Sequence, residues 1–307
     1  MIKERFSGVL APVVTPFKKD LSPDTDRFLH LCQWIVSQKA NLAIFGTNSE
    51  ANSLSVKEKI ELLEQLISSG VSGDSLMPGT GCCSISETVE LTKSAVSLGC
   101  RGVLMLPPFY YKGITDEGLF AYFSEVITRV NDNDLSIYLY HIPPISQIPL
   151  SSSLVNRLVS EYSEIVAGIK DSSGDWNQTE SFHKLNLPNF RIFCGSESFL
   201  LKNMQAGGAG CISATANVNS LAINELFTNW THTDAEFQQI KVDNIRNIFQ
   251  RYPMIPALKE AIALYSGDKE WSRVRAPLIP ISKDQSEALK NELEAADFGM
   301  DKLFELQ

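Results

Sequence analysis

The sequence predicts an α/β protein, and more closely a (β/α)8 TIM barrel with a C-terminal helical appendage. Eight short apolar runs alternate with eight amphipathic stretches across residues 8–230, and the connections between them are short. This alternation is typical of parallel strands joined by crossover helices, and eight such units suggest closure into a barrel. The length of 307 residues also fits, because α/β barrels commonly exceed about 250 residues as one domain.

The alternative fold is an open, doubly wound sheet. Such a sheet usually carries a glycine-rich turn after its first strand. The first apolar run here leads into the sequence APVVTP at residues 11–16, which contains no glycine. The first connection therefore favours the barrel.

The expected strands are the short apolar runs, and the expected helices are the amphipathic stretches between them. The runs cover residues 8–13, 42–45, 76–79, 102–106, 135–142, 165–169, 190–193 and 210–213. The helical stretches cover residues 24–39, 57–70, 84–98, 116–130, 151–162, 177–186, 197–206 and 218–230. Capping signals support several starts, for example Ser55 with Glu58 three residues later.

Three further helical patterns follow the eighth unit, at residues 234–249, 256–266 and 283–296. They exceed what a barrel needs. We expect residues 1–230 to form the barrel that carries the active site, and residues 231–307 to pack on it as helices. No low-complexity linker separates the two parts.

Composition excludes several classes of function. The net charge is −9 and no basic run is present, which argues against a nucleic-acid partner. No stretch has the length of a membrane span, and the N-terminus lacks the apolar region of a secretory signal, so we expect a cytoplasmic enzyme. The six cysteines show neither C-x-x-C nor zinc-ligand spacing, so we expect no metal site.

Lys170 is the most informative polar residue. It closes the apolar run 165–169 and is followed by Asp-Ser-Ser-Gly-Asp, a typical entry to a helix. At the carboxyl end of a barrel strand its amine would face the active-site mouth, and burial would penalise the ammonium form. A neutral amine can attack a ketone and form a Schiff base. The simpler interpretation is a lysine that extends its amine into solvent.

A Schiff-base enzyme that acts on 2-oxo acids also needs carboxylate donors and a proton shuttle. The turn Gly46-Thr47-Asn48 offers a hydroxyl and backbone amides for a carboxylate. Tyr140 lies near the end of the strand that precedes Lys170, where its phenol could move protons. Proline-rich loops after two other strands could keep bulk water out.

Seven motifs along the chain form a recognisable set. They are GVLAPVVTPF at residues 8–17, GT at 46–47, GTG at 79–81, PPFYY at 107–111, YxxP at 140–143, GIKDSS at 168–173 and GGAGCIS at 207–213. Together they resemble the dihydrodipicolinate synthase / N-acetylneuraminate lyase family of class I, pyruvate-dependent aldolases. The resemblance runs from about Phe6 to about Tyr265.

The resemblance implies a role for each matching position. Lys170 matches the lysine that forms a Schiff base with pyruvate, and Tyr140 matches the tyrosine that shuttles protons. Thr47 matches a threonine that hydrogen-bonds that tyrosine and the pyruvate carboxylate, and Asn48 supplies a backbone amide beside it. Tyr110, with Tyr111 as the alternative, matches a tyrosine that completes the relay from a neighbouring subunit. A homo-oligomer, either a tetramer or a dimer, is thereby implied, with no metal or organic cofactor.

Other matching positions bear on the substrate. Ile212 matches a position whose backbone carbonyl faces bound pyruvate. Ile145 stands where the synthase proper has an arginine that grips the carboxylate of aspartate semialdehyde, and no nearby arginine replaces it. An apolar side chain leaves such a charge unpaired. Glu197 matches an acidic residue that meets substrate hydroxyls in sialic-acid lyases. His141 should point away from the barrel interior and play a supporting role.

The sequence therefore predicts a class I lyase that joins or separates pyruvate and an aldehyde. The expected substrate is a 2-keto-3-deoxy sugar acid or a related hydroxylated 2-oxo acid. Two alternatives stay open: 4-hydroxy-tetrahydrodipicolinate synthase proper, and a non-catalytic barrel that binds a keto acid. A phosphate cradle at residues 207–210 is a weaker alternative, because this segment precedes the last strand and belongs to the opposite end of the barrel.

Overall fold

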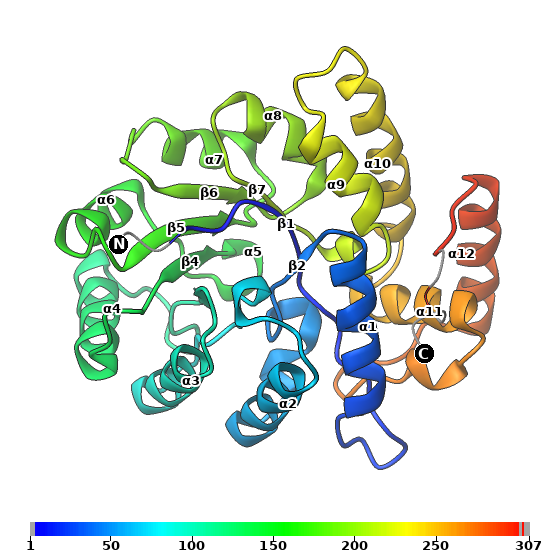
Figure 1. The fold of residues 1–307 in the computed structure, drawn as a ribbon, viewed down its shortest axis with the longest axis horizontal. Helices are drawn as coiled ribbons and strands as arrows, with labels where there is room; N and C mark the ends of the chain where they lie inside the picture. The colour runs from blue at the N-terminus through cyan, green and yellow to red at the C-terminus, as the bar shows by residue number, and fades with distance from the viewer. Residues whose placement is uncertain (1–3, 301–302, 304–307) are drawn as a thin grey trace.

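A curled parallel sheet surrounded by helices forms the centre of the molecule (Figure 1). The computed structural model describes residues 4–300 and 303. Within them, seven strands pair in the order β2-β1-β7-β6-β5-β4-β3, and every pair is parallel. The strands are β1 Gly8–Ala11, β2 Asn41–Leu42, β3 Val103–Met105, β4 Ile137–His141, β5 Val166–Asp171, β6 Arg191–Cys194 and β7 Gly210–Ile212.

The predicted strand at residues 76–79 is not a regular strand, so the prediction of eight strands is wrong at this position. The Met77 N–H donates to β2 over 2.8 Å and the Thr80 N–H donates to β3 over 3.0 Å, so the segment bridges the two edges of the sheet. Pro78 has no N–H and cannot donate to a ladder. A Cβ on Gly79 would lie 2.2 Å from a backbone oxygen after β2, which shows how closely the segment approaches.

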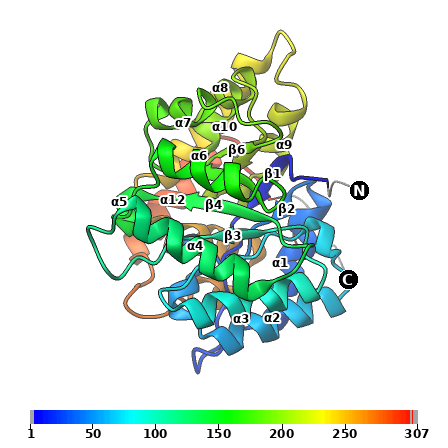
Figure 2. The same ribbon diagram turned by 90° about the vertical axis from the view of Figure 1, so that its left-hand side faces the viewer.

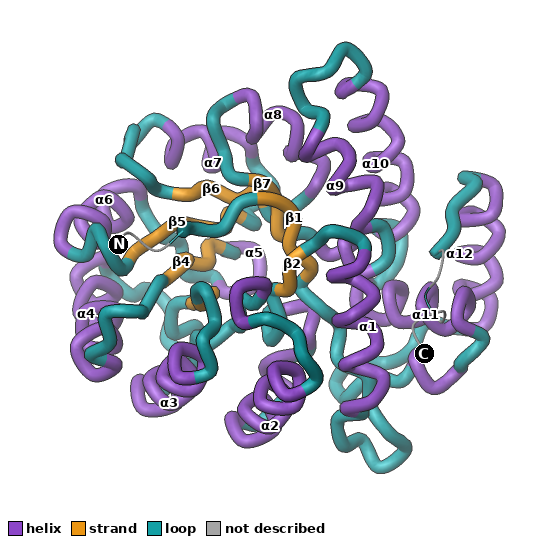
Figure 3. Tube along the Cα trace, in the orientation of Figure 1, coloured by secondary structure: helices purple, strands orange, loops and turns teal. Residues whose placement is uncertain are grey.

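Helices cover the outside of the sheet, as a parallel sheet with crossover connections requires (Figures 2 and 3). Figure 2 shows α2, α3 and α4 side by side on one side of the sheet, with α7 and α8 on the opposite side. The helices of this layer are α1 Thr25–Ser37, α2 Val56–Ser68, α3 Ile85–Ser97, α4 Asp116–Val130, α6 Ser152–Glu161, α7 Trp176–His183, α8 Leu200–Gln205 and α9 Ser220–Thr228.

Strand alternation divides the buried residues into two groups. In β4, Ile137 and Leu139 belong to the large apolar layer between the sheet and the helices. Tyr138 and Tyr140 belong to a smaller cluster that also includes Phe193 from β6. Tyr138 and Tyr140 therefore lie on one face of the strand, and this face lines the inside of the curled sheet.

In the part of the chain that the structure describes, three C-terminal helices follow the sheet, and the first two of them reach the carboxyl ends of the strands. They are α10 Ala235–Phe249, α11 Met254–Ser266 and α12 Lys283–Ala295. Helix α10 packs against α9 and against the turn Glu197–Phe199, while α11 contacts the turn Thr47–Ser49. A short helix, α5 Pro143–Ser146, forms within the proline-rich segment after β4. No helix among the described residues is both long and apolar enough to span a membrane.

Candidate active site

Lys170 and Tyr140 are neighbours across two strands. Tyr140 on β4 is in register with Lys170 on β5, next to the carboxyl end of each strand. The Lys170 amine lies 4.2 Å from the centre of the Tyr140 ring, and the lysine is only 2% exposed. A cation or amine over an aromatic face within this range is attracted by the ring. The pairing of β4 with β5 therefore positions a buried amine next to a phenol at the carboxyl ends of the strands.

Thr47 joins this pair from the other side of the sheet. Its hydroxyl and the Tyr140 hydroxyl are 3.1 Å apart, at hydrogen-bond distance. Thr47 begins the 3-10 turn Thr47–Ser49, which the Ser49 side chain closes by accepting a hydrogen bond from the Gly46 N–H over 3.2 Å. This turn follows β2, so its position depends on the sheet and not on sequence proximity to Tyr140.

A buried ion pair holds the end of the same turn. Glu50 adopts a left-handed backbone with φ 54°, which is uncommon for a non-glycine residue. Its carboxylate accepts hydrogen bonds from the Lys259 amine on α11 and, over 2.9 Å, from the Arg275 N–H. Both side chains of the ion pair are fully buried. The C-terminal helices thereby fix the backbone that carries Thr47.

A cavity of about 480 Å³ opens at the carboxyl ends of the strands. Its lining includes Lys170, Tyr140 and Thr47, together with the predicted substrate-binding residues Asn48 and Ile145. The remaining lining residues are Ile142, Asp171, Ser172, Gly174, Thr179, Gly195, Ser196, Ser198, Phe199, Ala214, Arg246, Gln250 and Met254. One pocket therefore collects five of the eight predicted site residues.

Three predicted residues do not line this cavity: Tyr110, Ile212 and Glu197. Tyr110 is 73% exposed and contacts Tyr111 edge to face, with ring centres 5.3 Å apart. Lys112 lies on the same loop, and its amine donates a hydrogen bond to the Ser146 carbonyl of α5 over 2.8 Å. This hydrogen bond connects the loop to α5. Ile212 is fully buried in β7 and belongs to the same inner cluster as Tyr140.

Glu197 lies behind the cavity wall. It is fully buried, and its carboxylate accepts hydrogen bonds from the hydroxyls of Ser213 and Thr215. The Arg246 guanidinium lies 3.5 Å from one of its oxygens. Burial raises the pKa of the Glu197 carboxyl, although Arg246 and Ser213 act in the opposite direction. The Glu197 carboxyl thus contacts other protein side chains and does not line the cavity.

Arg246 is a lining residue that sequence reasoning missed. The sequence shows no arginine near the YxxP motif, yet the structure brings one from α10 to the same cavity. Its only signal in the sequence is a place in an amphipathic helix, and many surface arginines share that signal. Identifying it requires knowing how α10 crosses the carboxyl end of the sheet.

His141 lies on the opposite face of β4 from Tyr140, as predicted. Its ring contacts the Phe182 ring of α7, with centres 5.5 Å apart, and its Nδ1 accepts a hydrogen bond from the Leu150 N–H over 3.0 Å. Burial lowers the pKa of His141, while nearby Asp171 acts against this shift. A neutral imidazole is consistent with an Nδ1 that accepts, and it anchors the segment after α5.

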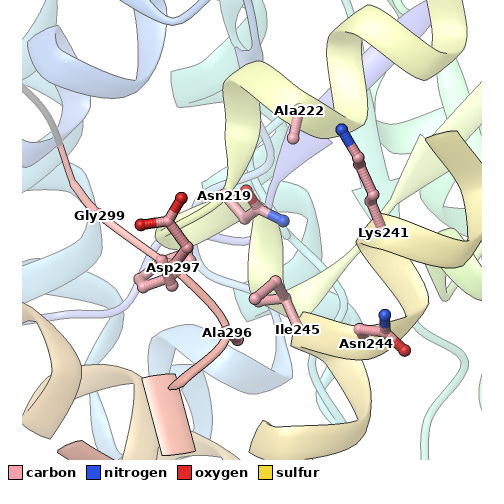
Figure 4. Close-up of a pocket in the computed structure, with 9 residues that line it drawn as sticks. Asn219, Ala222, Lys241, Asn244, Ile245, Ala296, Asp297 and Gly299 are labelled. Atoms are coloured by element: carbon pink, nitrogen blue, oxygen red, sulfur yellow. The ribbon is translucent and has the colours of Figure 1, made fainter. Parts of the chain in front are cut away.

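A larger pocket, about 760 Å³, lies away from these residues (Figure 4). It is lined by Asn219 immediately before α9, and by residues of α9, of α10 and of segment 296–299, among them Lys241 and Asp297. None of the eight predicted site residues belongs to it. Size alone therefore does not select the candidate active site, whereas the buried amine with its phenol partner does.

Comparison with known proteins places the chain among lyases. Residues 5–296 match the model of the dihydrodipicolinate synthetase family. An uncharacterized DapA-like lyase of Chloroflexus aurantiacus is 29% identical over 286 residues, covering 92% of this chain and 94% of that protein. A 4-hydroxy-tetrahydrodipicolinate synthase of Desulforamulus reducens is 28% identical and covers 93% of this chain and 96% of its own length.

Solved structures agree with the sequence relatives. Dihydrodipicolinate synthase from Agrobacterium tumefaciens superposes with a TM-score of 0.86 at 30% identity, covering 94% of this chain and 99% of that one. YagE from E. coli K12, a member of the same family solved in complex with pyruvate, gives 0.88 at 25% identity, covering 96% and 100%. The protein is a lyase with the curled parallel sheet of these enzymes. It belongs to the dihydrodipicolinate synthetase family, which confirms the resemblance found in the sequence.

Proposed function

We propose that the protein is a class I lyase that forms a Schiff base between Lys170 and a 2-oxo acid and breaks or makes a bond to C3 of pyruvate. This proposal rests on one observation: the buried Lys170 amine lies 4.2 Å from the centre of the Tyr140 ring. The hydroxyl of that tyrosine is hydrogen-bonded to the Thr47 hydroxyl, and all three residues line the same cavity. The pyruvate complex of YagE supports the choice of 2-oxo acid.

The reaction begins when the Lys170 nitrogen attacks C2 of the 2-oxo acid. The resulting carbinolamine loses water and becomes a protonated imine, which withdraws electrons from the neighbouring carbons. In the cleavage direction the C4 hydroxyl loses its proton, the C3–C4 bond breaks, and its electron pair forms an enamine while an aldehyde leaves. Protonation of the enamine at C3 and addition of water to the imine then release pyruvate and restore the free amine.

Tyr140 is the proposed proton carrier for these steps. Its ring lies against the amine and its hydroxyl is at hydrogen-bond distance from the Thr47 hydroxyl, so a proton can pass between substrate, phenol and threonine hydroxyl. The turn that begins with Thr47 and Asn48 is the proposed site for the carboxylate next to the keto group, where backbone N–H groups and a hydroxyl can donate.

The aldehyde part of the substrate is proposed to be hydroxylated, as in a 2-keto-3-deoxy sugar acid. Hydroxyl and amide side chains of Ser196, Ser198 and Gln250 line the cavity and can exchange hydrogen bonds with sugar hydroxyls. Ile145 lines the same cavity, is 62% exposed, and cannot pair with a charge. The second candidate is 4-hydroxy-tetrahydrodipicolinate synthase activity, which the names of relatives at 27–29% identity favour.

We further propose a homo-oligomer in which Tyr110 enters the cavity of a neighbouring copy. Two adjacent tyrosines, each 73% exposed, lie on a loop that Lys112 ties to α5, the helix bearing Ile145 of the cavity wall. Exposed aromatic pairs of this kind are typical of protein interfaces. The proposed cytoplasmic setting is supported by five free thiols: Cys32, Cys82, Cys83, Cys194 and Cys211.

Turnover assays test the proposed reaction. Wild-type protein should release pyruvate from one or more 2-keto-3-deoxy sugar acids, detected by coupling to lactate dehydrogenase. Lys170→Ala should reduce this activity to background while the circular dichroism spectrum and unfolding midpoint stay near those of wild type. Retained activity in a folded Lys170→Ala variant would contradict the mechanism. Faster condensation of pyruvate with aspartate semialdehyde than any sugar-acid cleavage would favour the second candidate.

A further inference from the structure

We infer that Arg246 binds an anionic group at the end of the substrate far from the keto carbon. This inference rests on the proposed function and narrows its substrate class to 2-keto-3-deoxy acids that carry a second carboxylate. Ile145 stands where the synthase proper has an arginine near the YxxP motif. The inference replaces the simpler view that the cavity therefore has no arginine for a substrate carboxylate. The two residues come from different elements, Ile145 from α5 and Arg246 from α10 (Figure 1).

The contacts of Arg246 hold its guanidinium at the cavity wall. One terminal nitrogen, Nη1, donates to the Ser213 hydroxyl over 3.3 Å and lies 3.5 Å from the Glu197 carboxylate. The side chain is only 13% exposed, and its Nε is buried without a hydrogen-bond partner among the described residues. A guanidinium has five N–H donors, so these contacts leave most of its donor capacity unused.

The nearest carboxylate of Arg246, Glu197, is shared with other hydrogen-bond donors. Both oxygens of Glu197 already accept hydrogen bonds from Ser213 and Thr215, and burial raises the pKa of this carboxyl. The carboxylate that does line the cavity, Asp171, accepts hydrogen bonds from the Ser173 N–H over 2.9 Å and from the Thr179 hydroxyl over 2.5 Å. A buried cation with an imperfect counter-ion attracts an anionic ligand, because pairing offsets its desolvation.

The arrangement of the cavity gives the second anion a defined place. The Thr47–Asn48 turn and Lys170 take up the carboxylate and keto carbon at one end of the substrate. Arg246 and Gln250 come from the C-terminal segment that begins with α10, a separate part of the lining. A 2-oxo acid whose chain ends in a carboxylate can therefore use both anion-binding groups, whereas a chain that ends in CH2OH uses only one. Guanidinium–carboxylate pairing also provides geometric selectivity.

The alternative is that Arg246 serves only as the structural counter-ion of Glu197. The two roles differ in what a substitution changes. A structural role predicts that replacing Arg246 lowers stability and lowers activity on all substrates alike. A binding role predicts a loss that depends on the charge at the far end of the substrate.

The test compares two matched substrates, a 2-keto-3-deoxy aldarate ending in a carboxylate and the corresponding 2-keto-3-deoxy aldonate ending in CH2OH. Wild-type protein should show the higher kcat/KM on the aldarate. Arg246→Met should lower kcat/KM on the aldarate by about 10- to 100-fold more than on the aldonate, the range expected for a charge-assisted hydrogen bond. Arg246→Lys should restore part of the preference, because it keeps the charge.

Lys241→Met is the matched control, because it removes a cation from the same helix outside this cavity. It should leave the ratio of the two kcat/KM values unchanged. The inference is overturned if wild-type protein does not prefer the aldarate, a measurement that needs no variant. It is also overturned if Arg246→Met affects both substrates equally. Failure of pyruvate to form a borohydride-trapped adduct on Lys170 would instead contradict the proposed function itself.

Discussion

Three side chains from distant parts of the chain define the candidate chemistry at the scale of single residues. Lys170 and Tyr140 meet because β4 and β5 are adjacent and in register. Thr47 meets them because β2 lies on another side of the curled sheet and its following turn points to the same end. Each residue alone has an ordinary structural interpretation, and only their convergence in one cavity indicates catalysis.

Tyr140→Phe tests the proton-transfer step. The substitution keeps the ring that faces Lys170 but removes the hydroxyl bonded to Thr47. We expect kcat to fall by about 100- to 10,000-fold, the usual contribution of a positioned acid or base. Capture of pyruvate by Lys170 should be affected less. Steady-state kinetics together with borohydride trapping would separate the two effects.

Tyr138→Phe is the matched control for that experiment. Tyr138 lies two residues earlier on the same face of β4, and its hydroxyl accepts a hydrogen bond from the Phe6 N–H over 2.7 Å. Removing this hydroxyl should lower stability by about 1 kcal/mol without a comparable fall in kcat. Equal losses of kcat in the two variants would argue against a specific role for Tyr140.

The residue-scale predictions from sequence were strongest where a residue ends a strand. Lys170 and Tyr140 could be placed because strand periodicity fixes the face and the end on which each lies. Arg246 could not be placed, since its approach depends on how α10 packs across the sheet. Glu197 matched a family position, but its burial beneath Ser213 and Thr215 is a property of tertiary packing.

At the scale of elements, turns and caps connect the strands to the C-terminal segment. Helix α2 begins with a capping box. The Ser55 side chain accepts a hydrogen bond from the Glu58 N–H, and the Glu58 side chain accepts one from the Ser55 N–H. Glu58 also forms an ion pair with Arg275, and the Arg275 guanidinium donates to the Ser53 carbonyl over 2.5 Å. The sequence predicted the cap, because the Ser-x-x-Glu spacing is local. It could not predict Arg275, which lies far along the chain.

The stability contributed by Glu58 should depend on pH. Hydrogen bonding to Arg275 lowers the pKa of Glu58 from its ordinary 4.5 to about 2 in the folded protein. Between these values the unfolded chain binds more protons, so the contribution is present above pH 4.5 and is lost as pH falls toward 2. Glu58→Gln should cost about 1 kcal/mol at neutral pH, since the pair is partly exposed to solvent.

Urea unfolding of wild type and Glu58→Gln across this pH range checks the prediction. The difference between their free energies of unfolding should shrink as the solution becomes more acidic. A difference that stays constant from neutral pH to pH 3 would show that the Arg275 pair does not contribute as described. Glu61→Gln, on the same helix and in a highly exposed ion pair with Lys57, is the control and should show little effect.

The strand expected at residues 76–79 shows a limit of element prediction. Its apolar run correctly indicated a buried segment between the edges of the sheet. Pro78 and Gly79 then prevent a regular ladder, the first by lacking an N–H and the second by approaching backbone too closely for a side chain. An apolar run in the sequence therefore predicts that a segment is buried. Whether the segment forms a regular β-strand also depends on whether each of its backbone N–H groups can hydrogen-bond to a neighbouring strand.

At the scale of the whole molecule, a buried ion pair joins the first and last parts of the chain. Glu50 follows the Thr47 turn, and Lys259 lies on α11, so the pair connects the turn proposed to bind the substrate carboxylate to the C-terminal helices. Burial lowers the pKa of Lys259 to about 8, although Glu50 acts to raise it. The sequence contains no pattern that pairs these two residues, because the contact arises only in the folded chain.

Removing one partner of this pair should be more harmful than removing both. Lys259→Met leaves the Glu50 charge buried without its cation, at an expected cost of about 3–5 kcal/mol. The double variant Glu50→Gln with Lys259→Met should regain most of this stability. Urea unfolding at neutral pH measures both. A double variant no more stable than Lys259→Met alone would contradict the assigned role of the pair.

Mixing of inactive variants tests the proposed exchange of Tyr110 between copies. Lys170→Ala protein lacks the proposed nucleophile, and Tyr110→Phe protein lacks the exposed hydroxyl. If Tyr110 acts in a neighbouring copy, equal mixing after dissociation and reassembly should restore about a quarter of the sites, because one site of each mixed pair is intact. If activity stays at the average of the two separate variants, Tyr110 does not act across the interface.

Borohydride trapping with pyruvate tests the central claim most directly. Protein incubated with pyruvate and then reduced should gain the mass of one reduced pyruvyl group per chain, and peptide mapping should locate it on Lys170. Lys170→Ala should gain none. A folded wild-type protein that forms no adduct with pyruvate, or forms it on a different lysine, would contradict the proposed Schiff-base mechanism.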